Sequence, residues 1–114
     1  MEISSTVDGD RVLVRVSGRI DALESARFWT ELQTQLELDV SVMIADLGAV
    51  DYVDSSGLAV LVRSWRQQQA AGRRFTVALP TSDSARRIFS LTGFDDVFDL
   101  VEAADAHRWS PRPG

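Results

Sequence analysis

The sequence contains no cysteine and no lysine, and it has a single histidine. The lack of cysteine excludes disulfides, thiol chemistry and zinc sites built on thiolates, and it fits a reducing compartment. No apolar run approaches the roughly 20 residues that a membrane-spanning helix needs. The first residues hold neither the basic region nor the apolar stretch of a signal peptide. We therefore expect a cytoplasmic protein that does not associate with membranes.

Positive charge is also scarce. The 12 basic residues are all arginine, and they are outnumbered by 17 acidic residues, which gives a formal net charge of −5. The arginines are scattered, apart from adjacent pairs at residues 73–74 and 86–87. Nucleic acids and anionic membrane surfaces are bound by clustered basic side chains. The charge therefore argues against both as partners, and we expect the two arginine pairs on solvated faces.

Length and composition indicate one globular domain. A chain of 114 residues with 45% hydrophobic and 25% charged residues is large enough to form a core without disulfides. The sequence has no internal repeat and no linker. We expect one domain over residues 1–109, followed by a flexible C-terminal tail over residues 110–114. We also expect the free protein to be a monomer.

Hydrophobic periodicity predicts strands that alternate with helices. Strands are expected at residues 2–7, 11–17, 40–46, 75–79 and 98–101, with a hairpin turn at residues 8–10 and Gly18 ending the second strand. Helices are expected at residues 22–36, 57–71, 85–92 and 102–109, and a loop at residues 47–56. The first helix has Asp21 as its N-cap and an apolar stripe of Ala22, Ala26, Trp29, Leu32 or Gln33, and Leu36. The pattern predicts an α/β fold, a mixed β-sheet packed with about four α-helices.

The most informative segment lies between the third strand and the second helix. It contains Asp51, Asp54, Ser55, Ser56 and Gly57. In open α/β sheets, sites gather where a strand ends and a helix begins. The helix N-terminus offers unpaired N–H groups and a partial positive charge, which would stabilise a phosphate on a nearby hydroxyl. Capping alone also explains the pattern, because Asp and Ser are preferred N-caps and glycine allows close packing of helix on sheet.

Three segments, in register along the chain, together carry a resemblance to a known family. They are residues 53–61 (VDSSGLAVL), residues 18–21 (Gly18-Arg19-Ile20-Asp21) and residues 91–98 (LTGFDDVF). The first resembles the central motif of the STAS family, in particular of its bacterial anti-sigma factor antagonists. The second resembles the Gly-x-Leu/Ile-Asp segment after the second strand of that family, and the third resembles the Leu-Thr-Gly-Leu segment before its last strand. The resemblance covers residues 2–104 and implies a STAS-like single domain.

The resemblance implies a partner-switching phosphoprotein in transcription regulation, and not an enzyme. In such antagonists the first serine of the motif, here Ser55, is phosphorylated by a serine-kinase anti-sigma factor. The unmodified antagonist captures the kinase and frees the sigma factor. The phosphorylated antagonist releases the kinase, and a metal-dependent serine phosphatase removes the phosphate again. ATP and Mg²⁺ belong to the kinase, so no cofactor is expected. The implied partner-binding residues are Asp21, Asp51, Asp54, Ser55, Ser56 and Gly57.

Ser56 is the rival phosphate acceptor. It lies one position further into the helix, so we expect its hydroxyl to point more towards backbone or sheet.

A hydrolase would need a general base near Ser55, but the sole histidine, His107, lies near the end of the chain and there is no Gly-x-Ser-x-Gly motif. The acids around the loop lack a calcium-loop pattern, so no metal site is expected.

A STAS module with another role is the remaining alternative. Some family members are structural subunits of lipid-transport complexes or of stress-signalling assemblies. The residues directly after the central motif are compatible with either group. The segment at residues 91–98 and the length of the chain favour the antagonists. Nucleotide sensing would need a glycine-rich phosphate cradle, which this sequence lacks.

Overall fold

The structure, a computed structural model, describes residues 1–106 except the side chains of Asp95 and Ala104. The predicted tail at residues 110–114 lies outside the described residues. A five-stranded mixed sheet has the strand order β1-β2-β3-β4-β5. β1 pairs antiparallel with β2, and the later strands each run parallel to their neighbour. The strands are β1 (Glu2–Asp8), β2 (Arg11–Ile20), β3 (Val42–Val53), β4 (Arg74–Ala78) and β5 (Asp99–Val101).

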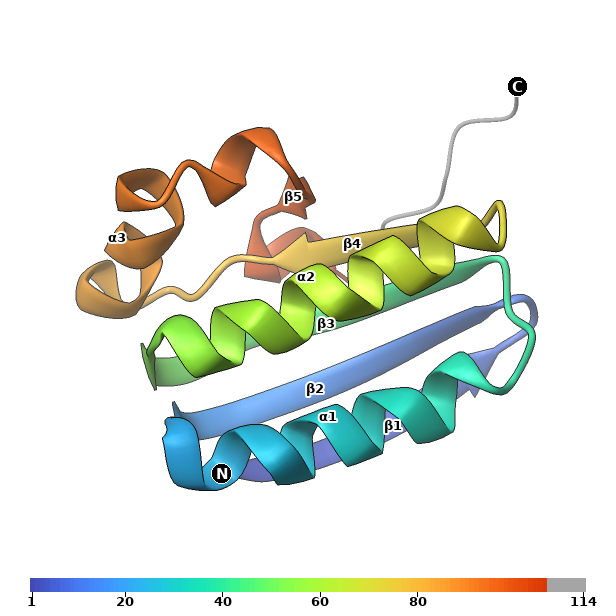
Figure 1. Ribbon diagram of the computed structural model, residues 1–114, viewed down its shortest axis with the longest axis horizontal. Coiled ribbons are helices and arrows are strands. Elements are labelled where there is room, and N and C mark those ends of the chain that lie inside the picture. Colours follow the sequence, from blue (N-terminus) through green and yellow to red (C-terminus); the bar gives the residue numbers. More distant parts are fainter. Residues whose placement is uncertain (107–114) are drawn as a thin grey trace.

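Two long helices cover one face of the sheet. In Figure 1, α1 (Ala22–Leu36) lies over β1 and β2, while α2 (Ser55–Ala70) lies beside it over β3 and β4. α3 (Asp83–Leu91) stands near the end of β3 where α2 begins. The main core lies between the helices and the sheet, because alternate side chains of β2 and β3 point to that face. Its members include Val12, Val14, Val16, Met43, Ala45, Leu47, Phe28, Leu32, Leu58 and Leu61.

The predicted bounds of α1 are confirmed, but part of its predicted apolar stripe is wrong. The residues that α1 buries are Phe28, Leu32 and Leu36. Ala26 is exposed, and Trp29 is only partly buried, with the Arg63 guanidinium 4.1 Å from the centroid of the Trp29 ring. A phenylalanine removes far more apolar area from water than an alanine does, so burying Phe28 sets the rotation of the helix.

The predicted helix at residues 102–109 is wrong in the part that the structure describes. That part forms a short 3-10 turn, η2 (Ala103–Asp105), and the described residues hold three α-helices instead of about four. The turn packs against β3 so closely that a Cβ added at Gly48 would lie 2.6 Å from the Cβ of Ala103. Another 3-10 turn, η1 (Phe94–Asp96), joins α3 to β5. None of the described helices has the length and apolar character needed to cross a membrane.

The loop predicted at residues 47–56 is also largely wrong, since β3 continues to Val53. It continues because β2 does not end at Gly18, which adopts a φ of 86°, but runs on to Ile20 and pairs with β3. Register shifts interrupt this pairing, so the buried residues no longer alternate as in a regular strand. As a result, α2 begins almost directly at the end of a paired strand.

Candidate functional site

The starts of α1 and α2 meet at one corner of the sheet. β2 and β3 end side by side, with Ile20 paired to Val53, and an aspartate N-cap follows each strand. The backbone N–H of Asp54 donates to the carbonyl oxygen of Ile20 at 3.3 Å. The backbone N–H of Ala22 in turn donates to the Asp54 carboxylate. The structure therefore brings together the predicted site residues Asp21 and Asp54, which are the N-caps of two helices that begin at the same end of the sheet in Figure 1.

Asp54 is the N-cap of α2. Its carboxylate accepts hydrogen bonds from the backbone N–H groups of Ser56 at 3.0 Å and Gly57 at 3.4 Å, and also from the Ser56 hydroxyl. The bond from the Ser56 hydroxyl, helped by the backbone bonds, holds the pKa of Asp54 below its usual value although burial acts to raise it. Asp54 is therefore ionised at neutral pH, and the hydroxyl of Ser56 is engaged.

Ser55 is placed differently from its neighbour. It is the first residue of α2 and is exposed, whereas Ser56 is partly buried. Within residues 1–106, no hydrogen bond of the Ser55 hydroxyl is found. An exposed hydroxyl at this end of a helix lies in the positive potential of the helix dipole. Of the two serines, Ser55 is the one with a hydroxyl accessible to a second protein.

Gly57 lies where the helix presses on the sheet. It is buried, and an added Cβ would lie 2.8 Å from Cγ2 of Val53 and 2.9 Å from Cγ2 of Ile20. Real Cβ atoms do not approach other atoms so closely, so a larger residue would push α2 away from the strand ends. Packing accounts for this glycine, and its role in partner binding stays a prediction.

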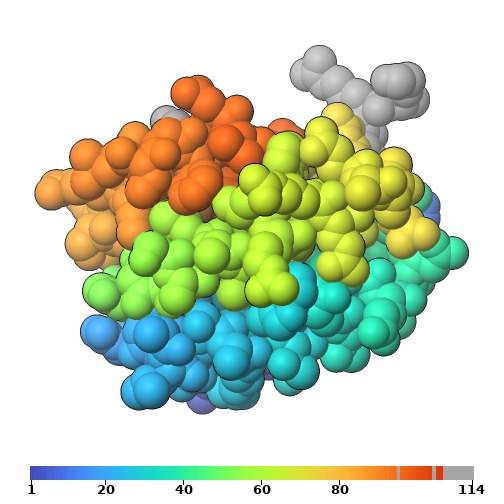
Figure 2. Space-filling view, viewed as in Figure 1, coloured from blue at the N-terminus to red at the C-terminus, as the bar shows by residue number. Residues whose placement is uncertain are grey.

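A groove of about 350 Å³ lies beside Ser55, between the end of β3 and α3. We call it the Ser55 groove. Asp51, which is exposed, lines it together with Tyr52, Val53, Asp54 and Ser55, while α3 contributes Ser84, Ala85, Arg87, Ile88 and Leu91. In Figure 2 the α3 segment, in orange, lies directly against the start of α2, in green. The sequence prediction missed the α3 residues as part of the site, and one of them, Leu91, is 76% exposed.

Arg19 connects Asp21 to this groove. Its guanidinium lies 4.2 Å from the centroid of the Tyr52 ring, and its Nε is 3.9 Å from Oδ2 of Asp21. Asp21 does not line the groove, but Arg19 links it to Tyr52, which does. Of the six predicted partner-binding residues, Asp51, Asp54 and Ser55 line the groove, whereas Asp21, Ser56 and buried Gly57 do not.

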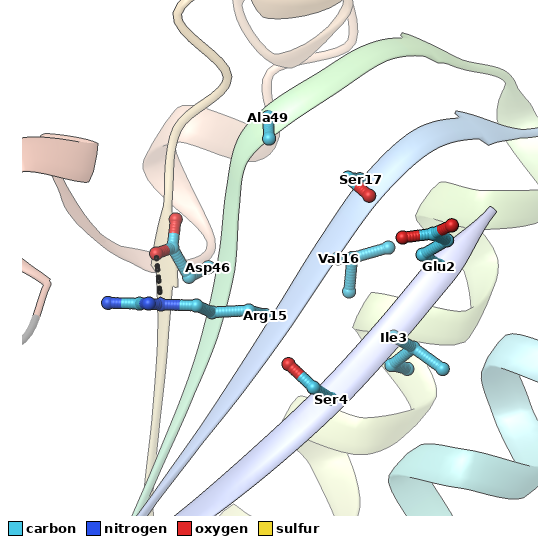
Figure 3. Close-up of a pocket in the computed structure, with 8 residues that line it drawn as sticks. All are labelled: Glu2, Ile3, Ser4, Arg15, Val16, Ser17, Asp46 and Ala49. Atoms are coloured by element: carbon cyan, nitrogen blue, oxygen red, sulfur yellow. Dashed lines mark ion pairs between the residues drawn. The ribbon is translucent and has the colours of Figure 1, made fainter.

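The sheet has another hollow, of about 290 Å³, away from the helix starts (Figure 3). Its lining includes Glu2, Ser4, Arg15, Ser17 and Asp46, and the Nε of Arg15 lies 3.7 Å from Oδ2 of Asp46. None of the predicted site residues lines it. In the part of the chain that the structure describes, no cluster of three or more His, Asp or Glu side chains is arranged to hold a metal ion.

This fold is that of a STAS domain. The STAS domain family matches residues 2–106, and the chain belongs to that family. The chain is similar to the anti-sigma-B factor antagonist of Listeria monocytogenes, with 32% identity over 96 residues that cover 82% of this chain and 81% of the relative. The corresponding protein of Listeria innocua matches to the same degree, with 32% identity.

Solved structures share the fold. A crystal structure of an anti-sigma factor antagonist from Mycobacterium paratuberculosis has a TM-score of 0.84 and 24% identity, and the match covers 94% of this chain and 91% of that one. The unphosphorylated form of the anti-sigma factor antagonist SpoIIAA has a TM-score of 0.70 and 18% identity, with 94% of each chain covered. The phosphorylated form of SpoIIAA from Bacillus has a TM-score of 0.69 and 19% identity, and covers 94% of this chain and 97% of that one. The α/β class and the mixed sheet predicted from the sequence are thus confirmed.

Proposed function

We propose that this protein is an anti-sigma factor antagonist whose binding to its partner is switched off by phosphorylation of Ser55. The unphosphorylated form captures a serine-kinase anti-sigma factor and releases the sigma factor, and a metal-dependent serine phosphatase restores that form. The antagonist itself carries out no chemistry, needs no cofactor and acts in the cytoplasm. The observation that carries the proposal is the exposed Ser55 hydroxyl at the start of α2, next to a Ser56 hydroxyl that is already bonded to Asp54.

The relatives support the same function. The Listeria proteins are named as antagonists of an anti-sigma-B factor, and they match over most of this chain. SpoIIAA, which has the same fold, exists in phosphorylated and unphosphorylated forms. The proposed switch requires Ser55 to change between the same two forms, phosphorylated and unphosphorylated.

The charge around Ser55 supports the direction of the switch. Phosphorylation adds a charge of about −1.5 to −2 at pH 7, on a surface that already carries Asp51 and Asp54. The dipole of α2 offsets only about 0.3–1 kcal/mol of the resulting repulsion. A dianion buried against acidic groups of a partner costs several kcal/mol, and about 2.8 kcal/mol already lowers the affinity 100-fold. The modification can therefore abolish a complex without unfolding the antagonist.

Incubation with the serine-kinase anti-sigma factor of the same organism and ATP tests the proposal. We expect mass spectrometry to find one added phosphate, at Ser55, in the wild type and in Ser56→Ala, and none in Ser55→Ala. Phosphate at Ser56 alone, or an unmodified chain, would contradict the switch.

Binding measurements complete this test. We expect Ser55→Asp to fold normally but to bind the kinase at least about 100-fold more weakly than the wild type. Ser55→Ala is its matched control, and it should bind and remain bound in the presence of ATP. If the protein instead co-purifies with a transporter ATPase and does not bind the kinase, the structural-subunit alternative replaces the proposal.

A further inference from the structure

The Ser55 groove contains one positively charged side chain. Its charged and titratable lining residues are Asp51, Tyr52, Asp54 and Arg87, and only Arg87 is basic. Arg87 lies on the face of α3 that also carries Ser84, Ile88 and Leu91. Residues at this spacing lie on one face of a helix, and that face lines the groove. Arg87 and Ser55, which are both exposed, therefore lie on opposite walls of the same hollow.

The neighbouring arginine has a different environment. Arg86 donates two hydrogen bonds to the carboxylate of Glu102, at 2.9 Å and 2.6 Å, and so ties α3 to the segment after β5. This pair lowers the pKa of Glu102. Arg87 makes no ion pair or side-chain hydrogen bond with any described residue. Arg86 therefore holds α3 in place, whereas Arg87 is available at the groove.

Several donors near a phosphate on Ser55 are already in use. Asp54 accepts the N–H groups of Ser56 and Gly57 at the start of α2, together with the N–H of Ala22. Arg19, near the end of β2, has its guanidinium over the Tyr52 ring and its Nε 3.9 Å from Oδ2 of Asp21. The other charged groups at the groove, Asp51 and Asp54, repel a phosphate. Among the residues that line the groove together with Ser55, Arg87 is the basic one.

We propose that Arg87 is the internal phosphate-binding residue of the modified protein, and that its guanidinium binds the phosphate of phosphorylated Ser55 across the groove. This inference rests on the proposed phosphorylation of Ser55. The planar guanidinium donates two parallel N–H bonds to phosphate oxygens, a geometry that an ammonium group does not offer. The bound phosphate occupies the hollow that Ile88 and Leu91 line, so the modification hides an apolar surface as well as adding charge.

The test uses the full chain with phosphoserine incorporated at position 55 during translation, so that no kinase is needed. The second pKa of a phosphoserine is about 6 and is read from the ³¹P NMR shift as a function of pH. An adjacent cation favours the dianion and lowers this pKa. We expect Arg87→Gln to raise the second pKa of the phosphate by about 0.2–0.7, as for an exposed ion pair. Arg87→Lys should have a smaller effect, because it keeps the charge and loses the planar fork.

Arg66→Gln is the matched control. Arg66 is an exposed residue of α2 that does not line the groove, and the substitution removes the same charge. We expect the phosphate pKa in this variant to equal that of the wild type. The resonance of the Arg87 side-chain Nε–H gives an independent measurement, and we expect it to shift on phosphorylation. Thermal unfolding of the unphosphorylated variants checks that each retains the fold.

Two results would overturn the inference: equal phosphate pKa values in Arg87→Gln and Arg66→Gln, or an Arg87 resonance that phosphorylation leaves unmoved. Neither result affects the proposed function, which depends on modification of Ser55 by the kinase. Conversely, if the kinase leaves Ser55 unmodified, the proposed function fails while the titration still reports whether Arg87 binds the phosphate.

Discussion

The starts of α1 and α2 have almost the same backbone, yet only one carries a candidate switch. Asp21 has φ −105° and ψ −173°, and Asp54 has φ −109° and ψ −173°. Each carboxylate accepts the N–H groups two and three residues further along. The next side chains differ: α1 continues with Ala22, Leu23 and Glu24, whereas α2 continues with Ser55, Ser56 and Gly57. The cap geometry is common to both helices, so the function must depend on the residues after the cap and on the surface that faces them.

Gly57 marks the largest difference between the two helix starts, since α1 has Glu24 at the same position. We expect Gly57→Ala to lower the free energy of unfolding by about 1–3 kcal/mol, because the new Cβ would overlap Val53 and Ile20. Alanine favours the helix by up to about 1 kcal/mol over glycine, which offsets part of this loss. Urea denaturation measures the effect. Glu24→Ala is the matched control and should cost less than about 1 kcal/mol. A Gly57→Ala protein as stable as the wild type would mean that α2 can move away from the sheet freely.

The two caps are expected to contribute unequally. Replacing either by alanine should cost about 0.5–2 kcal/mol of stability. We expect Asp54→Ala to cost more than Asp21→Ala, because Asp54 also accepts the Ser56 hydroxyl and the N–H of Ala22. Denaturant unfolding of both variants at pH 7 provides the comparison. Equal losses of stability in the two variants would show that the additional hydrogen bonds of Asp54 do not stabilise the protein.

Asp54 should also give the stability a pH dependence. Its pKa in the folded protein lies below the usual value of 3.8, so the ionised carboxylate stabilises the fold above that value. This contribution is lost as the pH falls through the folded pKa. Asn is also a good N-cap, so Asp54→Asn removes mainly the charge. We expect the stability difference between the wild type and Asp54→Asn to be largest near neutral pH and to shrink below about pH 4. A difference that is constant from pH 7 to pH 3 would contradict the assigned ionisation.

The smallest effect is expected from moving the serine to the other helix. Ala22→Ser places a hydroxyl at the first position of α1, and it should change the stability by less than about 0.5 kcal/mol. In the double variant Ala22→Ser/Ser55→Ala we expect the kinase to add no phosphate, because position 22 does not line the Ser55 groove. Mass spectrometry after incubation with kinase and ATP measures this. A phosphate at position 22 would show that an exposed hydroxyl at a helix start is sufficient.

Capping is a local property, and an aspartate before an apolar helical pattern is a short-range signal. Asp21 caps α1 as expected. For Asp54 capping was one of the roles that the sequence left open, and the structure shows that it caps α2. The extension of β3 was not predictable in this way, because residues 47–53 pair only with a β2 that continues past Gly18. The α3 wall of the groove was missed for a related reason. Arg87 and Leu91 reach Ser55 only through the crossover from β4, which no local pattern reveals.

The hydrogen bonds from Asp54 to Ile20 and from Ala22 to Asp54 fasten both helix starts to the same strand ends. The two helices are thus joined to each other where they begin. At such a corner the proposed phosphate on Ser55 would act on a partner through its charge and through the apolar surface that it covers. This signal would arise when the covalent bond is made and disappear when it is hydrolysed.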